Sequence, residues 1–264
     1  MPKDPAIPIV LVFGGSDPTG GAGIQADIEA AASHGCHAAA VLTAVTVQDT
    51  TNVVHFTPQP PESVFHQARV VLEDMDVRAI KIGMLGSPLV AEAVEVLLGQ
   101  YPHVPVVLDP VLSAGGGGTL ARDGLVEALR RLLPHTLVVT PNTPEARQLA
   151  HGADTAQASA LQLLEAGTQF VLLTGGHEPG PEVVNTLYAR TGGIQEQRWP
   201  RLPGEYHGTG CTLASALAAR IAQGQPVPEA ARAAQEYTWH SLRHAFCAGG
   251  GQQLPDRFHW CRRR

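Results

Sequence analysis

Short and almost wholly apolar runs alternate with helical patterns along this chain. Residues 9–13, 106–108 and 170–173 consist of valine, isoleucine, leucine and phenylalanine, which is typical of strands buried on both faces of a sheet. Longer segments with helical spacing lie between most of these runs. This alternation predicts an α/β fold in which a mostly parallel sheet carries helices on both faces.

The expected elements follow from the same patterns. We expect strands at residues 9–13, 38–47, 79–82, 106–108, 137–140 and 170–173, and a hairpin of strands at 183–190 and 193–199. We expect helices at residues 23–34, 60–74, 88–98, 122–133, 143–150, 155–165, 211–223 and 228–246. Neither an internal repeat nor an inter-domain linker is visible, so residues 1–264 are expected to form a single domain.

Composition narrows the class of protein. A formal net charge of −6 gives no reason to expect nucleic acid or a membrane as a partner. No apolar run is long enough to span a membrane, and the first residues do not resemble a signal peptide. The four cysteines form no C-x-x-C pair and have no zinc spacing, so we expect free thiols in a reducing cytoplasm.

Ligands of such folds bind beyond the carboxyl ends of the strands. The segments that follow the predicted strands contain most of the unusual glycines and polar residues of the chain. They are residues 14–23, 47–51, 83–86, 109–118, 141–145 and 174–177.

Cys211 stands where a glycine-containing turn enters an alanine-rich helix. Unpaired N–H groups and the partial positive charge of a helix N-terminus favour anions and would lower the pKa of a cysteine there. Alternatively, the turn is an ordinary loop and Cys211 is a small buried apolar residue.

Further residues allow both a functional and a structural interpretation. Asp109, Asn142 and Glu145 follow predicted strands, where they could bind a metal and a nucleotide or simply cap turns and helices. His240 and His244 are spaced for one helix face, but no third ligand is visible, so we interpret them as a solvated or capping pair.

Two nucleotide-binding patterns are weak or missing. Residues 21–26 match the G-x-G-x-x-G/A pattern formally, but the glycines lie too far beyond the preceding strand for a dinucleotide fingerprint. No G-x-x-x-x-G-K-[ST] segment is present.

Seven motifs in order resemble a known family. They are the segment from Gly14 to Asp27, Thr43-Ala44 through Gln48-Asp49-Thr50, Lys81-Ile82-Gly83-Met84-Leu85, Val107-Leu108-Asp109-Pro110-Val111, Thr140-Pro141-Asn142 with Glu145-Ala146, and Gly175-Gly176-His177 followed by His207-Gly208-Thr209-Gly210-Cys211-Thr212. Together they resemble the hydroxymethylpyrimidine/phosphomethylpyrimidine kinases of thiamine biosynthesis, members of the ribokinase-like superfamily. The resemblance spans roughly residues 8 to 246.

This resemblance implies a ribokinase-like three-layer α/β/α sandwich, ATP as co-substrate with Mg²⁺, a small pyrimidine as substrate, and a homodimer. It implies an anion hole for the transferred phosphoryl group at Gly208, Thr209 and Gly210, with Cys211 as the base. It assigns the pyrimidine to Gly15, Asp27, Gln48 and Met84. It assigns ATP to Asn142, Thr174, Gly176 and Thr212, and Mg²⁺ to Asp109 and Glu145.

The chain departs from the family pattern at three places. Thr174 replaces a lysine that usually reaches the phosphates, Leu112 replaces a methionine, and Ser113 to Gly118 replace an Ala-Lys-Ser-Gly-Asp segment. Loss of these cations predicts weaker ATP or phosphate-substrate binding. The alternatives are a pyridoxal-type kinase of the same superfamily, which generally carries aspartate in place of Cys211, a pyrimidine binder without catalysis, and a kinase that retains only one phosphorylation step.

Overall fold

The computed structural model describes residues 7–113 and 123–261. The strands are β1 (Ile9–Ser16), β2 (His37–Gln48), β3 (Val53–Pro58), β4 (Val77–Ile82), β5 (Val106–Leu108), β6 (Val138–Val139), β7 (Phe170–Leu173), β8 (Glu182–Ala189) and β9 (Ile194–Pro200). The helices are α1 (Gly23–Ser33), α2 (Pro61–Asp74), α3 (Pro88–Gln100), α4 (Leu125–Leu132), the 3₁₀ turn η1 (Leu133–His135), α5 (Thr143–Leu149), α6 (Ala156–Glu165), α7 (Thr209–Ala222) and α8 (Val227–Arg243).

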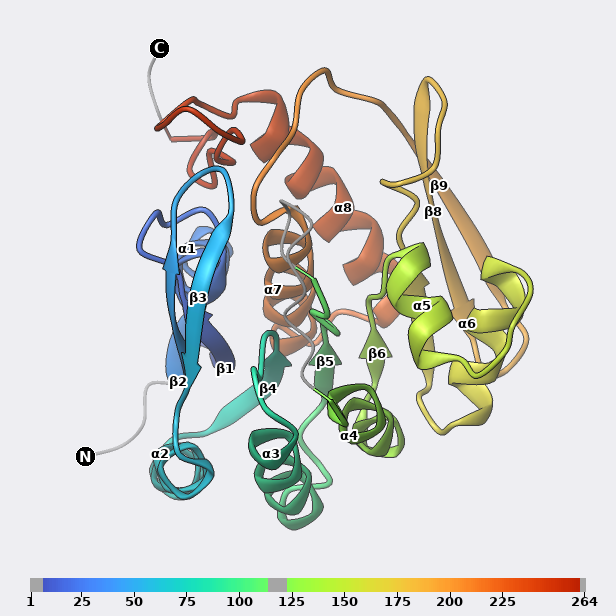
Figure 1. Cartoon of the computed structure of the whole chain (residues 1–264). Helices are drawn as coiled ribbons and strands as arrows, with labels where there is room; N and C mark the ends of the chain where they lie inside the picture. Colours follow the sequence, from blue (N-terminus) through green and yellow to red (C-terminus); the bar gives the residue numbers. More distant parts are fainter. Residues whose placement is uncertain (1–6, 114–122, 262–264) are drawn as a thin grey trace.

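All the described strands belong to one sheet with the order β3-β2-β1-β4-β5-β6-β7-β8-β9. Six neighbouring strands run parallel to one another, namely β2, β1, β4, β5, β6 and β7. Each of β3, β8 and β9 pairs antiparallel with the strand before it in the sequence. Helices α2 to α4 lie on one side of the sheet, and α1, α7 and α8 lie on the other (Figure 1). The predicted three-layer α/β/α sandwich is confirmed.

Strand β1 shows why its sequence is apolar without interruption. Leu11 and Phe13 pack into the core with α2 to α6, whereas Val10 and Val12 pack into the core with α1, α7 and α8. Side chains alternate between the two faces of a strand, so a strand covered on both faces needs apolar residues at every position. On the second face, α7 is buried almost throughout because its alanines allow close contact with the sheet and α8.

The expected elements are confirmed within a few residues, with one omission. Strand β3 was not predicted: it is a largely exposed antiparallel partner of β2, so its sequence lacks the apolar signature of a buried strand. The expected helix at 122–133 begins at Leu125, and the last helix ends at Arg243 rather than at residue 246. Most of the Ser113 to Gly118 departure lies outside the described residues.

The strand order changes direction at β1, within the sheet. From β1 the chain proceeds to β2 on one side and later returns to β4 on the other side, which creates a crevice at the carboxyl ends of these strands. Within the described ranges, none of the helices has the length and apolarity needed to cross a membrane.

Candidate active site

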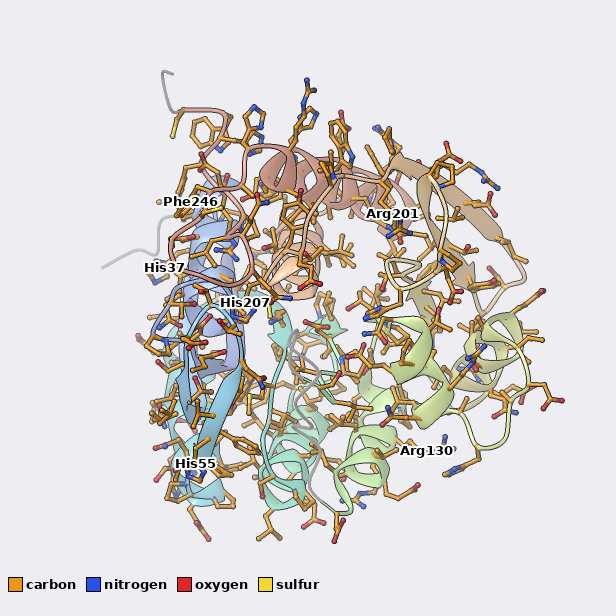
Figure 2. All side chains as sticks on the ribbon, turned by 45° about the horizontal axis from the view of Figure 1, so that its top comes forward. His37, His55, Arg130, Arg201, His207 and Phe246 are labelled. Atoms are coloured by element: carbon orange, nitrogen blue, oxygen red, sulfur yellow. The ribbon has the colours of Figure 1, made fainter. Side chains whose placement is uncertain are left out.

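A cavity of about 820 Å³ lies beyond the carboxyl ends of the parallel strands. His207 and Arg201 line it from opposite sides (Figure 2). All the residues predicted for the site line this cavity except Asp27 and Thr212. They are Gly15, Gln48, Met84, Asp109, Asn142, Glu145, Thr174, Gly176, Gly208, Thr209, Gly210 and Cys211.

The N-terminus of α7 forms one wall of the cavity. Gly208 is the N-cap residue and has a φ of 74°, a left-handed conformation that favours glycine. A Cβ atom at Gly208 would also collide with the carbonyl oxygen of Gly21, so the position has no space for a side chain. The first N–H groups of α7 have no partner within the helix, and Thr209 and Gly210 line the cavity; an anion site at these two residues stays a prediction.

Cys211 lies in the first turn of α7 and is partly exposed in the cavity. Burial raises the pKa of its thiol to about 11, and the carboxylates of Asp109 and Asp27 add to this effect. The Lys81 ammonium and a hydrogen bond from the Gly23 N–H act in the opposite direction. The predicted lowering of the pKa by the helix N-terminus is therefore wrong, and Cys211 is a neutral thiol at neutral pH.

A buried ion pair lies beneath Cys211. Lys81 Nζ donates a hydrogen bond to Asp27 Oδ1 at 2.8 Å, and Ser215 Oγ donates to the same oxygen at 2.7 Å. Burial opposes the charge on Lys81, but Asp27, Cys211 and Asp109 outweigh it and raise the pKa of the ammonium. Asp27 is fully buried and does not line the cavity, so the structure does not support its predicted direct contact with a pyrimidine.

Thr212 is also displaced from its predicted role. Its hydroxyl is buried, donates to the Gly208 carbonyl oxygen at 2.9 Å and accepts from Arg257 Nε at 2.9 Å. Because it lies behind the turn rather than on the cavity wall, direct contact with ATP is not supported. Thr212 instead braces the residue that opens α7.

Asp109 and Glu145 are two buried carboxylates on the same cavity. Burial raises the pKa of Asp109 to about 6, with Lys81 opposing and Asp27 adding to the shift. Burial, reinforced by Asp109, raises the pKa of Glu145 to about 8. Asp109 Oδ2 is buried without a hydrogen-bond partner among the described residues. Oxygen ligands of this kind suit Mg²⁺, which keeps several waters and binds through one or two carboxylates plus substrate phosphates.

Glu145 also has the structural role considered from the sequence. Asn142 Oδ1 accepts from the Glu145 N–H at 2.9 Å, and Glu145 Oε2 accepts from the Asn142 N–H at 3.0 Å. These two bonds form a capping box at the start of α5. Both residues line the cavity, so capping holds them in place at the site. No described group of three or more His, Cys, Asp or Glu side chains could hold a metal without other ligands.

The end of the cavity for which the resemblance predicts a pyrimidine is formed by β1, β2 and the segment after β4. Gln48 Nε2 donates to Thr46 Oγ1 at 2.7 Å, which leaves its carbonyl oxygen for other donors. A Cβ atom at Gly15 would lie 3.2 Å from the Met84 sulfur, so the backbone of Gly15 and the side chain of Met84 form adjacent walls. Gln48 provides the polar edge of this apolar pocket.

The opposite end of the cavity has an aromatic wall that the sequence analysis missed. The rings of Trp199 and Trp239 are stacked, with their centroids 6.3 Å apart. Gln235 Oε1 accepts hydrogen bonds from Trp199 Nε1 at 3.1 Å and from Asn185 Nδ2 at 3.0 Å. These residues come from β8, β9 and α8, far from the glycine motifs, and only the tertiary structure brings them to the site.

Arg201 is another cavity residue that the sequence did not indicate. Its guanidinium donates to the carbonyl oxygens of Gly176, Glu178 and Gly180 in the loop after β7. Arg201 lines the cavity next to Gly176, so it shapes the loop and adds a positive charge to that end. Neither its spacing nor a motif in the sequence indicated this role.

Asp17 and His207 join the two glycine-containing turns of the site. His207 Nε2 lies 2.9 Å from Asp17 Oδ2, and the same carboxylate accepts from the N–H groups of Thr19 and Ala22 at 2.8 and 2.7 Å. Although burial opposes it, these hydrogen bonds, led by that of His207, lower the pKa of Asp17 to about 2. The ionised carboxylate thus organises residues 17–22.

The pair His240 and His244 lies away from the cavity. His244 is the C-cap residue of α8, and its Nδ1 lies 2.9 Å from the His240 carbonyl oxygen. His259 stacks on both rings. The capping interpretation is therefore confirmed.

Residues 17–256 match the family described as phosphomethylpyrimidine kinase. A hydroxymethylpyrimidine/phosphomethylpyrimidine kinase of Streptomyces coelicolor is 43% identical over 253 residues and covers 92% of each chain. The crystal structure of a phosphomethylpyrimidine kinase from Clostridium difficile has a TM-score of 0.77 and 31% identity, covering 89% of this chain and 99% of that chain. An ADP complex of Bacillus subtilis pyridoxal kinase has a TM-score of 0.86 and 27% identity, covering 96% and 98%.

Proposed function

The chain belongs to the phosphomethylpyrimidine kinase family, and we propose that its cavity performs two successive phosphoryl transfers. It is a phosphotransferase of thiamine biosynthesis that takes ATP as co-substrate. The substrates are 4-amino-5-hydroxymethyl-2-methylpyrimidine and then its monophosphate, which becomes the diphosphate. The observation that carries this proposal is the single cavity that joins the polar pocket of Gln48 and Met84 to the anion turn of α7 and the aromatic wall.

The pyrimidine binds at the end formed by Gly15, Gln48 and Met84. Gln48 offers an amide that can pair with the exocyclic amino group and ring nitrogen of an aminopyrimidine, and such pairing discriminates strongly against rings without these groups. The hydroxymethyl group then points toward Cys211 and the N-terminus of α7. Phosphoryl transfer needs a proton acceptor next to this hydroxyl group, and the Cys211 Sγ atom occupies that position.

The transferred phosphoryl group is stabilised by the N–H groups at Gly208, Thr209 and Gly210. Donors fixed before the reaction stabilise charge that develops in the transition state at little reorganisation cost. Because a thiol cannot accept a second proton, we infer that Cys211 acts from its minor thiolate form, which Lys81 favours. Ionisation releases the thiol proton to solvent, and the thiolate then takes the hydroxymethyl proton during phosphoryl transfer and becomes a thiol again. Its raised pKa makes the thiolate a strong base once formed, and Lys81 lies close enough to oppose the charge of the neighbouring carboxylates.

Asp109 and Glu145 would hold Mg²⁺ together with the phosphates of ATP. When bound, the ion would neutralise phosphate charge and also the charge of these carboxylates. The nucleotide base is placed against Trp199 and Trp239, since stacked aromatic rings bind the faces of purines. Asn142 and the loop with Thr174 and Gly176 then face the phosphates, and Arg201 supplies a cation at this end in the absence of the usual lysine.

Two alternatives differ in measurable ways. The structural likeness to a pyridoxal kinase favours a test of pyridoxal as an acceptor. A binder that lacks catalysis would keep the pocket of Gln48 but release no ADP. We also propose a cytoplasmic homodimer, for which the exposed valines of the β2–β3 edge, Val45, Val47 and Val54, provide an apolar surface.

The function is tested by ADP release with ATP and Mg²⁺, measured separately with the hydroxymethylpyrimidine, its monophosphate and pyridoxal. Turnover of both pyrimidines is expected, with a much lower kcat/KM for pyridoxal. Turnover of only one pyrimidine would restrict the function to one step. Binding of both without ADP release would favour the non-catalytic binder.

A further inference from the structure

Arg257 is the largest fully buried side chain in the described part of the protein, with 2% of its surface exposed. Its Nε donates to Thr212 Oγ1 at 2.9 Å, and one terminal nitrogen donates to Gly20 O at 3.1 Å and Glu29 Oε2 at 3.0 Å. The other terminal nitrogen donates to the Gly21 carbonyl oxygen. A buried guanidinium requires partners for its donors, and most of the partners here are uncharged atoms of the two turns that form the site.

We propose that Arg257 is a positioning residue for phosphoryl transfer, which fixes the turn at residues 17–22 against the turn that opens α7. The proposal rests on the proposed function for its kinetic consequences. Arg257 does not line the cavity, and its donors are directed at protein atoms. It therefore acts on the reaction through other groups rather than by touching a substrate.

One path leads from Arg257 to the anion site through a single hydroxyl. Thr212 Oγ1 accepts from Arg257 and donates to the Gly208 carbonyl oxygen at 2.9 Å. Gly208 precedes the N–H groups that would face the phosphoryl group. The guanidinium thus holds the start of α7 from behind.

The second path leads to the opposite turn. The guanidinium fork binds Gly20 and Gly21, and Gly21 is in direct contact with the α7 turn, because a Cβ atom on Gly208 would collide with the Gly21 oxygen. A Cβ atom on Gly21 would collide in turn with the ring of His207. The two turns are therefore closely packed against each other, and a shift of one must move the other.

The backbone beside Arg257 is anchored to the same region. Gln253 exchanges hydrogen bonds with the preceding turn: its carbonyl oxygen accepts from the His207 N–H, and its N–H donates to Glu205 O, both at 2.9 Å. The Leu254 side chain lies against Gly21. The segment after α8 thus delivers the guanidinium in a fixed direction.

This arrangement predicts a loss of turnover rather than of substrate binding. Preorganised donors lose effect when they move by a fraction of an ångström, and a misplacement of 1 Å costs roughly 10²-fold in rate. The pyrimidine pocket is built on β1, β2 and the segment after β4, so its affinity should change little. Lysine cannot replace Arg257, because a single ammonium lacks the planar fork that reaches both turns.

The test compares Arg257→Lys and Arg257→Met with the wild type and with Arg130→Met. Arg130 also donates to a backbone carbonyl oxygen, that of Leu149, but it lies on α4 away from the cavity (Figure 2). For each protein we would measure kcat and both KM values by ADP release, the melting temperature, and hydrogen exchange of the peptides that contain residues 17–22 and 205–212. Assays run well below the lowest melting temperature.

We expect both Arg257 variants to lose at least tenfold in kcat while the KM for the pyrimidine changes by less than threefold, and the exchange of both turns to increase. Guanidinium at low millimolar concentration should restore part of the kcat of Arg257→Met. Arg130→Met should lower only the melting temperature. A folded Arg257→Lys protein with wild-type kcat would overturn the proposal, as would turns that exchange no faster than in Arg130→Met.

Two further outcomes are distinguishable. If the wild type turns over neither pyrimidine, the proposed function fails, but hydrogen exchange still decides whether Arg257 holds the two turns. If Arg257→Met does not fold, Arg257→Lys and Thr212→Val decide. Thr212→Val interrupts the path to Gly208, and combining it with Arg257→Lys should cost no more in kcat than the larger single effect; additive losses would contradict a shared path.

Discussion

Lys81 Nζ on β4 donates to Asp27 Oδ1 on α1 at 2.8 Å, and neither side chain is more than 1% exposed. Removal of one partner leaves an uncompensated buried charge. We expect Lys81→Met to lower the free energy of unfolding by about 3–5 kcal/mol, measured by urea denaturation.

The matched control is Arg131→Met. Arg131 pairs with Glu92 and Glu95, but its side chain is 44% exposed, and exposed pairs contribute about 0–1 kcal/mol. Similar losses in the two variants would show that the Lys81–Asp27 pair does not stabilise the core.

Cys211→Ala should reduce kcat by roughly 10²- to 10⁴-fold, the range typical of a lost general base. The Kd of the pyrimidine, measured by calorimetry, should remain nearly the same, because Gly15, Gln48 and Met84 are untouched. Cys247→Ser, at an exposed cysteine, should leave both quantities unchanged. Wild-type turnover by folded Cys211→Ala would exclude the base role.

The raised pKa of Cys211, about 11, predicts slow alkylation at neutral pH. The thiolate is the reactive form, so the iodoacetamide rate at Cys211 should still rise by roughly tenfold per pH unit above pH 8.5, where a cysteine with an ordinary pKa begins to level off. Peptide mass spectrometry follows Cys211 separately from the exposed Cys247 and Cys261. A plateau at Cys211 below pH 8 would instead indicate a stabilised thiolate.

Gln48→Ala should weaken pyrimidine binding by roughly tenfold, which corresponds to the loss of about one well-paired hydrogen bond. ATP affinity should not change, because Gln48 lies at the opposite end of the cavity from Trp199 and Trp239. Gln67→Ala, on the exposed face of α2, is the control. Calorimetry with each ligand checks the result, and an unchanged pyrimidine Kd would mean that the ring binds elsewhere.

The lowered pKa of His34 predicts that the free energy of unfolding decreases in mild acid. Burial lowers its pKa to about 4, with Arg220 adding to the effect and the hydrogen bond to Ala30 O opposing it. In the unfolded chain the imidazole has a pKa near 6.5, so below that pH the unfolded state takes up the proton first. The stability is present above pH 6.5 and falls by up to about 3 kcal/mol as the pH approaches 4.

Urea denaturation at several pH values measures this slope. His34→Gln, which keeps a donor for the Ala30 carbonyl oxygen, should flatten the decrease between pH 6.5 and 4. The control His103→Gln, at an exposed position, should keep the wild-type slope. Equal slopes in all three proteins would show that His34 does not cause the acid sensitivity.

The sequence was sufficient for the parallel core, because β1, β5 and β7 are apolar on both faces and carry their glycines and polar residues at their ends. It was insufficient for β3, whose pairing with β2 is not encoded in an apolar pattern of its own. It also misjudged Cys211. The helix N-terminus is a local feature, whereas the burial that raises the pKa of the thiol, with a smaller addition from Asp109 and Asp27, arises only in the tertiary structure.

The residues of the candidate site also divide into those that the sequence could predict and those that it could not. Glycines and carboxylates next to strand ends could be predicted because parallel strands end at one edge of the sheet. Trp239 and Arg257 could not, since they lie on α8 and beyond it and reach the site only through tertiary packing. Asp27 belongs to one of the motifs that resemble the family, but only its buried ion pair with Lys81 shows that it lies behind the cavity wall.

The contact between Arg257 and the turn at Gly20 and Gly21 joins segments that lie at least 236 residues apart in the sequence. During synthesis, β1 and its turn leave the ribosome long before Arg257 is added. Domains can begin to fold as they emerge, but this turn has to wait until residue 257 has been added before its guanidinium partner arrives. A nascent chain can therefore begin to pair its first strands well before it can acquire a fully braced site.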